Sequence, residues 1–209
     1  MTSGRHDAAT RQLNYEPGDV EQLRRSVRTF GFGCLPGAIA PTVLQKLQIE
    51  ARERYSLAVF ADQSAELSYR ANLVSLGPEA AGLLSGMEAR ELMYSVFRRE
   101  VELSAGVSCL TYYREGDYLG PHLDQPAEQC VVTALVYLSA TAAASPSSGT
   151  GLVLRVYGEE APAGREPILT IPTLAGAIVV GRGSKVWHER PVLQPGEQVM
   201  AITGCYALA

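Results

Sequence analysis

The chain has 209 residues, of which 46% are hydrophobic and 19% are charged, and its net charge at pH 7 is -4. This size and balance fit a single globular domain with a proper apolar core. The acidic balance argues against a nucleic-acid-binding protein, which needs a clustered basic face. No apolar run approaches the length of a membrane-spanning helix. The start of the chain also lacks the apolar stretch of a secretory signal, so we expect a cytoplasmic protein.

The first half of the chain carries helical patterns. Residues 1–15 are polar and small, and we expect them to be disordered. Apolar residues at helical spacing, with Pro or Asp at the starts, predict four helices. These begin near Asp19, Pro41, Pro78 and Met87, and the last runs to Leu103. A short strand is predicted over Phe30–Leu35, whereas Phe60–Ala71 stays ambiguous.

The second half is rich in short β-type runs separated by turn residues. The predicted strands are Val107–Tyr113, Cys130–Ser139, Gly151–Tyr157, Pro167–Ile171, Ala175–Val180 and Gln198–Tyr206. Such spacing is typical of a β-sandwich or barrel. We therefore predict a mainly β, α+β protein with a single domain over 16–209, in which helical residues 16–104 support a β core at 105–209. The low-complexity segment Ala140–Thr150 is predicted to be a mobile loop.

The four cysteines, Cys34, Cys109, Cys130 and Cys205, are dispersed and form no Cys-x-x-Cys pair. We expect buried, reduced thiols, with a zinc site or a disulfide as the alternatives.

Two of the three histidines stand in a context that suits a metal. His122 and Asp124 are two residues apart, so on an extended backbone they project to the same side. His188 follows 64 residues after Asp124, whereas His6 lies in the polar N-terminus. Two histidines and one carboxylate leave three coordination positions open, the facial triad of non-haem Fe(II) oxygenases. The plainer alternative is that all three are ordinary strand and turn residues.

The residues around these ligands resemble a known family. The first motif block comprises Tyr113, Gly116, Tyr118 and Pro121-His122-Leu123-Asp124. The following segments are Thr133–Leu138, Gly149–Leu154, Gly176–Val180, His188-Glu189, Pro191-Val192 and Met200–Thr203. Together, residues from about 105 to 207 resemble the prolyl-4-hydroxylase-like branch of the Fe(II)/2-oxoglutarate-dependent dioxygenases.

The resemblance implies a double-stranded β-helix, or jelly roll, with Fe(II) held between its sheets by His122, Asp124 and His188. It also implies that 2-oxoglutarate and dioxygen serve as cosubstrates and that a C–H bond is oxidised, usually by hydroxylation. Tyr113 and Thr203 match hydroxyl positions that touch 2-oxoglutarate in the family. Because the compact chain leaves little room for a protein-recognition domain, we expect a small-molecule or amino-acid-like substrate, with no nucleic-acid or membrane partner.

The chain departs from the family at the cosubstrate anchor. The family carries Arg or Lys nine or ten residues after the distal histidine. Here the corresponding residues are Glu197 and Gln198, or Val199 if the turn is longer, and none is basic. Gln198 can donate hydrogen bonds but offers no charge, so the cation must come from elsewhere. The candidates are Arg190, which shares strand parity with His188, and Arg182, Lys185 and Arg155.

Four residues are candidate substrate contacts: Arg70, Tyr118, Arg155 and Trp187. Arg70 precedes the β core, where related enzymes place substrate contacts. Arg155 is a charge inside an apolar strand, which either reaches an edge or binds something. Tyr118 and Trp187 flank the metal motifs, and both also fit simple core packing.

Three other functions stay open. The chain could be an Fe(II) oxidase or oxygenase that does not use 2-oxoglutarate, or a non-catalytic jelly-roll module that binds a metal or a ligand. It could also be a metal-dependent lyase or isomerase on the same scaffold, which would work with Zn(II) or Ni(II).

Overall fold

The computed structural model of the chain describes residues 11–62, 67–142 and 149–209. The predicted mobile segment Ala140–Thr150 and His6 lie largely or wholly outside these residues. The helices are α1 Pro17–Phe30, α2 Pro41–Arg54, α3 Pro78–Ser85 and α4 Met87–Phe97, with single 3-10 turns at Tyr55–Leu57 and Ala105–Val107. Among the described residues, no helix is long and apolar enough to cross a membrane.

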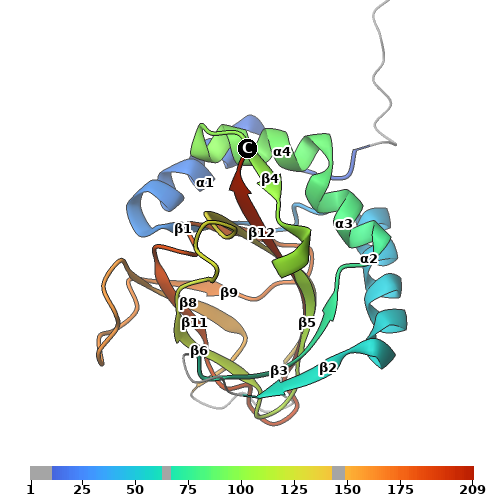
Figure 1. The fold of residues 1–209 in the computed structure, drawn as a ribbon, viewed down its shortest axis with the longest axis vertical. Helices are drawn as coiled ribbons and strands as arrows, with labels where there is room; N and C mark the ends of the chain where they lie inside the picture. Colours follow the sequence, from blue (N-terminus) through green and yellow to red (C-terminus); the bar gives the residue numbers. More distant parts are fainter. Residues whose placement is uncertain (1–10, 63–66, 143–148) are drawn as a thin grey trace, which may run out of the picture.

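Most of the remaining chain forms antiparallel strands (Figure 1). They are β1 Phe32–Leu35, β2 Val59–Asp62, β3 Tyr69–Ser75, β4 Val101–Leu103, β5 Cys109–Tyr113, β6 Tyr118–His122, β7 Val132–Thr141, β8 Val153–Gly158, β9 Leu169–Pro172, β10 Ile178–Gly181, β11 Trp187–Arg190 and β12 Gln198–Leu208. Their order is β1-β10-β7-β12-β5-β3-β6-β11-β8-β9, with β2 beside β3 and β4 beside β12. This nearly closed sheet is a jelly roll, as the sequence predicted.

Strand alternation divides the apolar side chains into two cores. Tyr112, Val136 and Ile202 belong to the first core, which also contains apolar residues of α1, α2, α3 and α4. The neighbouring Tyr113, Tyr137 and Ala201 belong to the second core, together with Leu154 and Val156 of β8. The helices therefore cover the outside of one half of the sheet, while the second core lies between the two halves.

In the N-terminal half the structure departs from two predictions and resolves one region that the sequence left ambiguous. The helix predicted to reach Leu103 ends at Phe97, because Arg98 has φ of 56° and Val101–Leu103 pairs with β12 instead. Residues 11–15 are ordered onto the domain, where Leu13 is buried and bridges to Ile39. The ambiguous region resolves into β2 and β3, and β3 joins the two halves of the sheet by pairing with both β5 and β6.

The cysteine prediction is wrong for one pair. Cys130 and Cys205 form a disulfide across 75 residues of sequence, while Cys34 and Cys109 are free. Pairing of β7 with β12 places Cys205 opposite Thr133, close to Cys130, which explains how two distant residues meet. The disulfide ties the segment that follows Asp124 to the last strand.

Candidate metal centre

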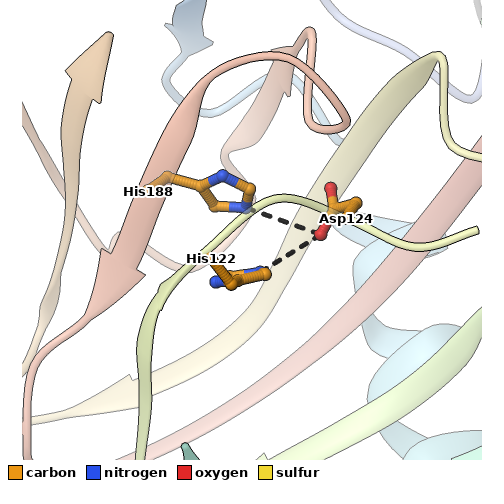
Figure 2. A group of neighbouring side chains, drawn as sticks. All are labelled: His122, Asp124 and His188. Carbon is orange, nitrogen blue, oxygen red and sulfur yellow. Dashed lines mark hydrogen bonds and ion pairs between the residues drawn. The ribbon is translucent and has the colours of Figure 1, made fainter. Parts of the chain in front are cut away.

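The three predicted ligands meet at one end of the space between the sheet halves. β6 ends at His122, Asp124 follows two residues later, and the antiparallel register of β6 with β11 sets His188 opposite His122. Figure 2 shows the two imidazoles converging on the carboxylate. The Asp124 Oδ1 lies 3.1 Å from Nε2 of His122 and 3.6 Å from Nε2 of His188. One donor atom from each residue lies within 4.8 Å of the others, a spacing that suits a shared metal ion.

Backbone carbonyls orient both imidazoles. Nδ1 of His122 lies 2.9 Å from the carbonyl of Gly120, and Nδ1 of His188 lies 2.9 Å from that of Val186. A carbonyl only accepts, so each Nδ1 donates, and in a neutral ring the lone pair of Nε2 then faces Asp124. Two lone pairs facing a carboxylate oxygen repel one another unless a cation sits among them. The donor set therefore fits a divalent metal bound by two Nε2 atoms and one carboxylate oxygen.

Asp124 is itself held by groups that the sequence did not reveal as part of the site. The hydroxyl of Thr133 on β7 donates to Oδ2, which leaves Oδ1 facing the histidines. The amide of Asp124 donates to the carbonyl of Gly183, 3.0 Å away. A Cβ at Gly183 would collide with both Oδ2 of Asp124 and Oγ1 of Thr133. The carboxylate thus sits in a cradle that has no room for a side chain at residue 183.

The surroundings keep the ligands in their metal-binding protonation states. His122 and His188 are buried, with 7% and 3% of their surface exposed. Burial, followed by the neighbouring His122, lowers the pKa of His188 to about 4. Burial alone would raise the pKa of Asp124, but His188, His122 and Thr133 together hold it well below its ordinary value. At neutral pH the site thus presents a neutral imidazole at His188 and an ionised carboxylate at Asp124, the forms that bind a metal.

The wall of the site beside His188 is aromatic. The ring of Phe32 on β1 lies 4.7 Å from the His188 ring, and the two histidine rings are 4.2 Å apart. Phe32 is completely buried, so this side of the site is apolar and closed to water.

Arg190 lies in the same interior as the ligands. It follows His188 by two residues on β11, and only 4% of its surface is exposed. Its Nη1 donates to the carbonyl of Gly151 at 3.1 Å and to Oγ1 of Thr173 at 3.0 Å. Its guanidinium carbon lies 5.2 Å from the centre of the Tyr113 ring and 5.3 Å from that of Tyr137.

The other predicted cosubstrate contacts, Tyr113, Thr203 and Gln198, differ in how deeply they are buried. Tyr113 is part of the second core beside Arg190. Thr203 is half-buried on β12, with its hydroxyl 3.4 Å from that of Thr111. Gln198 is exposed at the start of β12, whereas the next residue, Val199, is buried in the second core. Glu197, the other position that corresponds to the family's anchor, is buried, but its carboxylate accepts bonds from Thr150, Gly151 and Gln194. None of these positions therefore presents a cation to the interior.

The candidate substrate contacts are scattered. Arg155 pairs with Glu189 at 3.2 Å on the outer face of the sheet, since both residues alternate with buried neighbours. Trp187 precedes His188 and by strand alternation lies on that same outer side. Arg70 is exposed and pairs with the buried Asp117 at 3.2 Å, above the ring of Phe60. The hydroxyl of Tyr118 lies 3.1 Å from that of Ser68. None of these four joins the ligands.

The fold is shared with solved structures of non-haem oxygenases. A prolyl-4-hydroxylase from Pseudomonas putida is 18% identical, with a TM-score of 0.63 over 91% of this chain and 99% of that one. The α-ketoglutarate-dependent epimerase SnoN of nogalamycin biosynthesis is 15% identical, with a TM-score of 0.75 over 93% and 82%. A 2OG-Fe(II) oxygenase family protein from Burkholderia pseudomallei is 15% identical, with a TM-score of 0.65 over 95% and 96%. No family model and no curated protein matches the sequence.

Proposed function

We propose that the chain is a non-haem Fe(II)- and 2-oxoglutarate-dependent oxygenase that hydroxylates a C–H bond of a small-molecule or amino-acid-like substrate. The observation that carries this proposal is the arrangement of His122, Asp124 and His188. Their donor atoms lie within 4.8 Å of one another inside a jelly roll, and backbone carbonyls preset both imidazole tautomers. Three protein ligands leave positions for a chelating cosubstrate and dioxygen.

Bound Fe(II) would supply the redox chemistry, in which 2-oxoglutarate, dioxygen and R–H give succinate, carbon dioxide and R–OH. One oxygen atom of dioxygen enters succinate and the other enters the product. The protein's part is to hold and shield the reactants. His122, Asp124 and His188 would fix the metal, Thr133 would orient the carboxylate, and Phe32 would exclude water beside His188.

Support for the cosubstrate comes from the neighbours in fold. SnoN has been solved with Fe³⁺, α-ketoglutarate and nogalamycin RO, and it shares the fold over 93% of this chain. SnoN is named an epimerase and the related SnoK a carbocyclase, so this fold serves outcomes other than hydroxylation. Hydroxylation is proposed here because a prolyl-4-hydroxylase and a prolyl hydroxylase share the fold over 91% and 90% of this chain.

The test is release of labelled carbon dioxide from 2-oxoglutarate labelled at its first carbon. We expect slow release even without substrate, and this release should require both Fe(II) and dioxygen. His122→Ala should abolish it. Turnover of any substrate with Zn(II) or Ni(II) in the absence of oxygen would contradict the proposal and favour a lyase or isomerase, because only the oxygenase needs a redox-active metal.

A further inference from the structure

We infer that Arg190 on β11 binds the far carboxylate of the 2-oxo diacid, in place of a basic residue on the last strand, β12. This inference rests on the proposed function and names the residue that would select a dicarboxylate cosubstrate. It rests on three features: the side chains that β12 presents, the charge balance around Arg190, and the position of Arg190 relative to His188.

The start of β12 offers no cation to the interior. Gln198 is exposed, and Val199, which is only 3% exposed, packs in the second core beside Tyr113 and Ala201. Glu197 is buried, but its carboxylate accepts bonds from Thr150, Gly151 and Gln194. An anion between the sheet halves would therefore meet an apolar side chain at the start of β12. The positive charge that balances this anion must come from another strand.

Arg190 is a buried cation that forms no ion pair within the described residues, although its charge helps to lower the pKa of Glu197. A guanidinium stays charged at all physiological pH values, and a buried charge is normally paired. Among the described residues, no carboxylate lies within ion-pairing distance of Arg190, and only Nη1 donates hydrogen bonds to the protein. The N–H groups of Nε and Nη2 thus remain available to donate to a ligand. A carboxylate bound by these atoms would offset the cost of burying the charge.

Neighbouring side chains complete a site for an anion. The hydroxyl of Tyr137 is buried close to Arg190 and Thr173, but in the part of the chain that the structure describes it makes no hydrogen bond of acceptable geometry. The rings of Tyr113 and Tyr137 lie on the guanidinium, which restrains its plane. A carboxylate in contact with Arg190 could also accept a bond from the Tyr137 hydroxyl, so an orphaned donor and an unpaired cation would share one ligand.

The distance from the metal centre suits one molecule that reaches both places. His188 and Arg190 lie on the same face of β11, and two residues of a strand span about 7 Å. A five-carbon 2-oxo diacid that chelates the metal through its 2-oxo acid end would direct its far carboxylate along the strand toward Arg190. A 2-oxo acid of equal length without the second carboxylate would leave Arg190 unpaired.

Glu197 is a positioning residue for this site. Its Oε2 accepts the amide of Gly151 at 2.9 Å, and the carbonyl of Gly151 accepts Nη1 of Arg190. The backbone of Gly151 packs closely against that of Val192, since a Cβ at residue 151 would lie 2.6 Å from the Val192 carbonyl oxygen. The Glu197 carboxylate therefore holds the loop at Gly151, and the carbonyl of Gly151 in turn positions the side chain of Arg190.

The experiment compares two 2-oxo acids on the anaerobic Fe(II) protein, with 2-oxopentanoate as the analogue that lacks the far carboxylate. Dissociation constants are read from the visible band of the chelated 2-oxo acid, so no turnover is needed. We expect the protein to prefer 2-oxoglutarate by about 30-fold or more, since breaking a buried charged pair costs at least that much. Arg190→Gln should abolish this preference while leaving the affinities for Fe(II) and 2-oxopentanoate within a few-fold.

Arg54→Gln is the matched control, because Arg54 donates to Ser75 from α2, outside the sheet interior, and it should keep the full preference. A preference retained in Arg190→Gln would overturn the inference but leave the proposed function standing. Absence of the band with either acid in the unmodified protein would overturn both. If Arg190→Gln does not fold, Arg190→Lys keeps the charge but loses the two-pronged contact, and its preference should fall. An unchanged preference in that variant would also overturn the inference.

Discussion

His188 and Arg190 stand two residues apart on the same buried face of β11, so one short strand carries both a candidate metal ligand and a cation that forms no ion pair with the described residues. Strand geometry sets the separation of these side chains, and the pairing of β11 with β6 and β8 fixes the strand between its neighbours. Because both side chains belong to β11, the metal-binding and anion-binding groups keep a constant position relative to each other. Binding sites keep their geometry when they are built on such rigid elements.

Gly183→Ala should weaken metal binding without unfolding the protein. The added methyl group would push against Oδ2 of Asp124 and Oγ1 of Thr133 and so turn the carboxylate away from the histidines. We expect a loss of about 10- to 100-fold in Fe(II) affinity, as for other changes behind a metal ligand. Anaerobic Fe(II) titration measures it. Gly82→Ala is the control, since a Cβ at this exposed helical glycine meets nothing.

Thr133→Val should act through the same carboxylate. The substitution keeps the side-chain shape and removes the hydroxyl that donates to Oδ2 of Asp124. Fe(II) affinity should again fall by about 10- to 100-fold. Thr141→Val, at the exposed end of the same strand, should leave it unchanged. Equal affinities in the two variants would mean that Thr133 does not orient the ligand.

Glu197→Gln should lower the free energy of unfolding in a pH-dependent way. Burial raises the pKa of Glu197, but bonds from Thr150, Gln194 and Gly151, with the charge of Arg190, lower it overall below 4.5. The ionised carboxylate therefore stabilises the fold above pH 4.5, and this stabilisation is lost as pH falls through the folded pKa.

At pH 7 we expect Glu197→Gln to cost about 1.5–3 kcal/mol, the range for hydrogen bonds to charged groups. Urea unfolding at pH 7 and at pH 3 to 4 measures the difference, which should shrink at the lower pH. Glu128→Gln, an exposed control, should show little cost at either pH. A cost that stays constant with pH would mean that the charge of Glu197 contributes nothing.

Reduction of the Cys130–Cys205 disulfide should destabilise the protein. The bond closes a loop of 75 residues, and loss of such a cross-link typically costs about 2–5 kcal/mol. A reducing agent should therefore lower the melting temperature of the unmodified protein. It should have no further effect on the variant that carries Cys130→Ala and Cys205→Ala. An equal effect on both would show that the shift does not come from this bond.

Sequence patterns correctly predicted the features that depend on residues close together in the chain. His122 and Asp124 meet because two residues of an extended chain share a side, and the apolar β-type runs became strands for the same reason. Strand parity also marked Arg190 as a neighbour of His188. In contrast, Val101–Leu103 continues a helical pattern in the sequence, and only its pairing with β12 turns it into a strand.

Contacts between distant segments account for what sequence patterns did not reveal. Gly183 joins the site because the turn after β10 passes against Asp124, and no periodicity encodes that approach. Arg155 and Arg190 are both charges within strands, but only the pairing of β8 with β11 shows that Arg155 meets Glu189 on the outer face. Cys130 and Cys205 likewise become neighbours through β7 and β12.

The most direct test of the metal centre is an anaerobic titration of the metal-free protein with Fe(II) and then with 2-oxoglutarate. The arrangement of His122, Asp124 and His188 predicts tight Fe(II) binding, followed by the weak visible band of a chelated 2-oxo acid, and it predicts that His188→Ala loses both. Fe(II) binding without the band would contradict use of 2-oxoglutarate. An undiminished band in His188→Ala would contradict the metal centre itself.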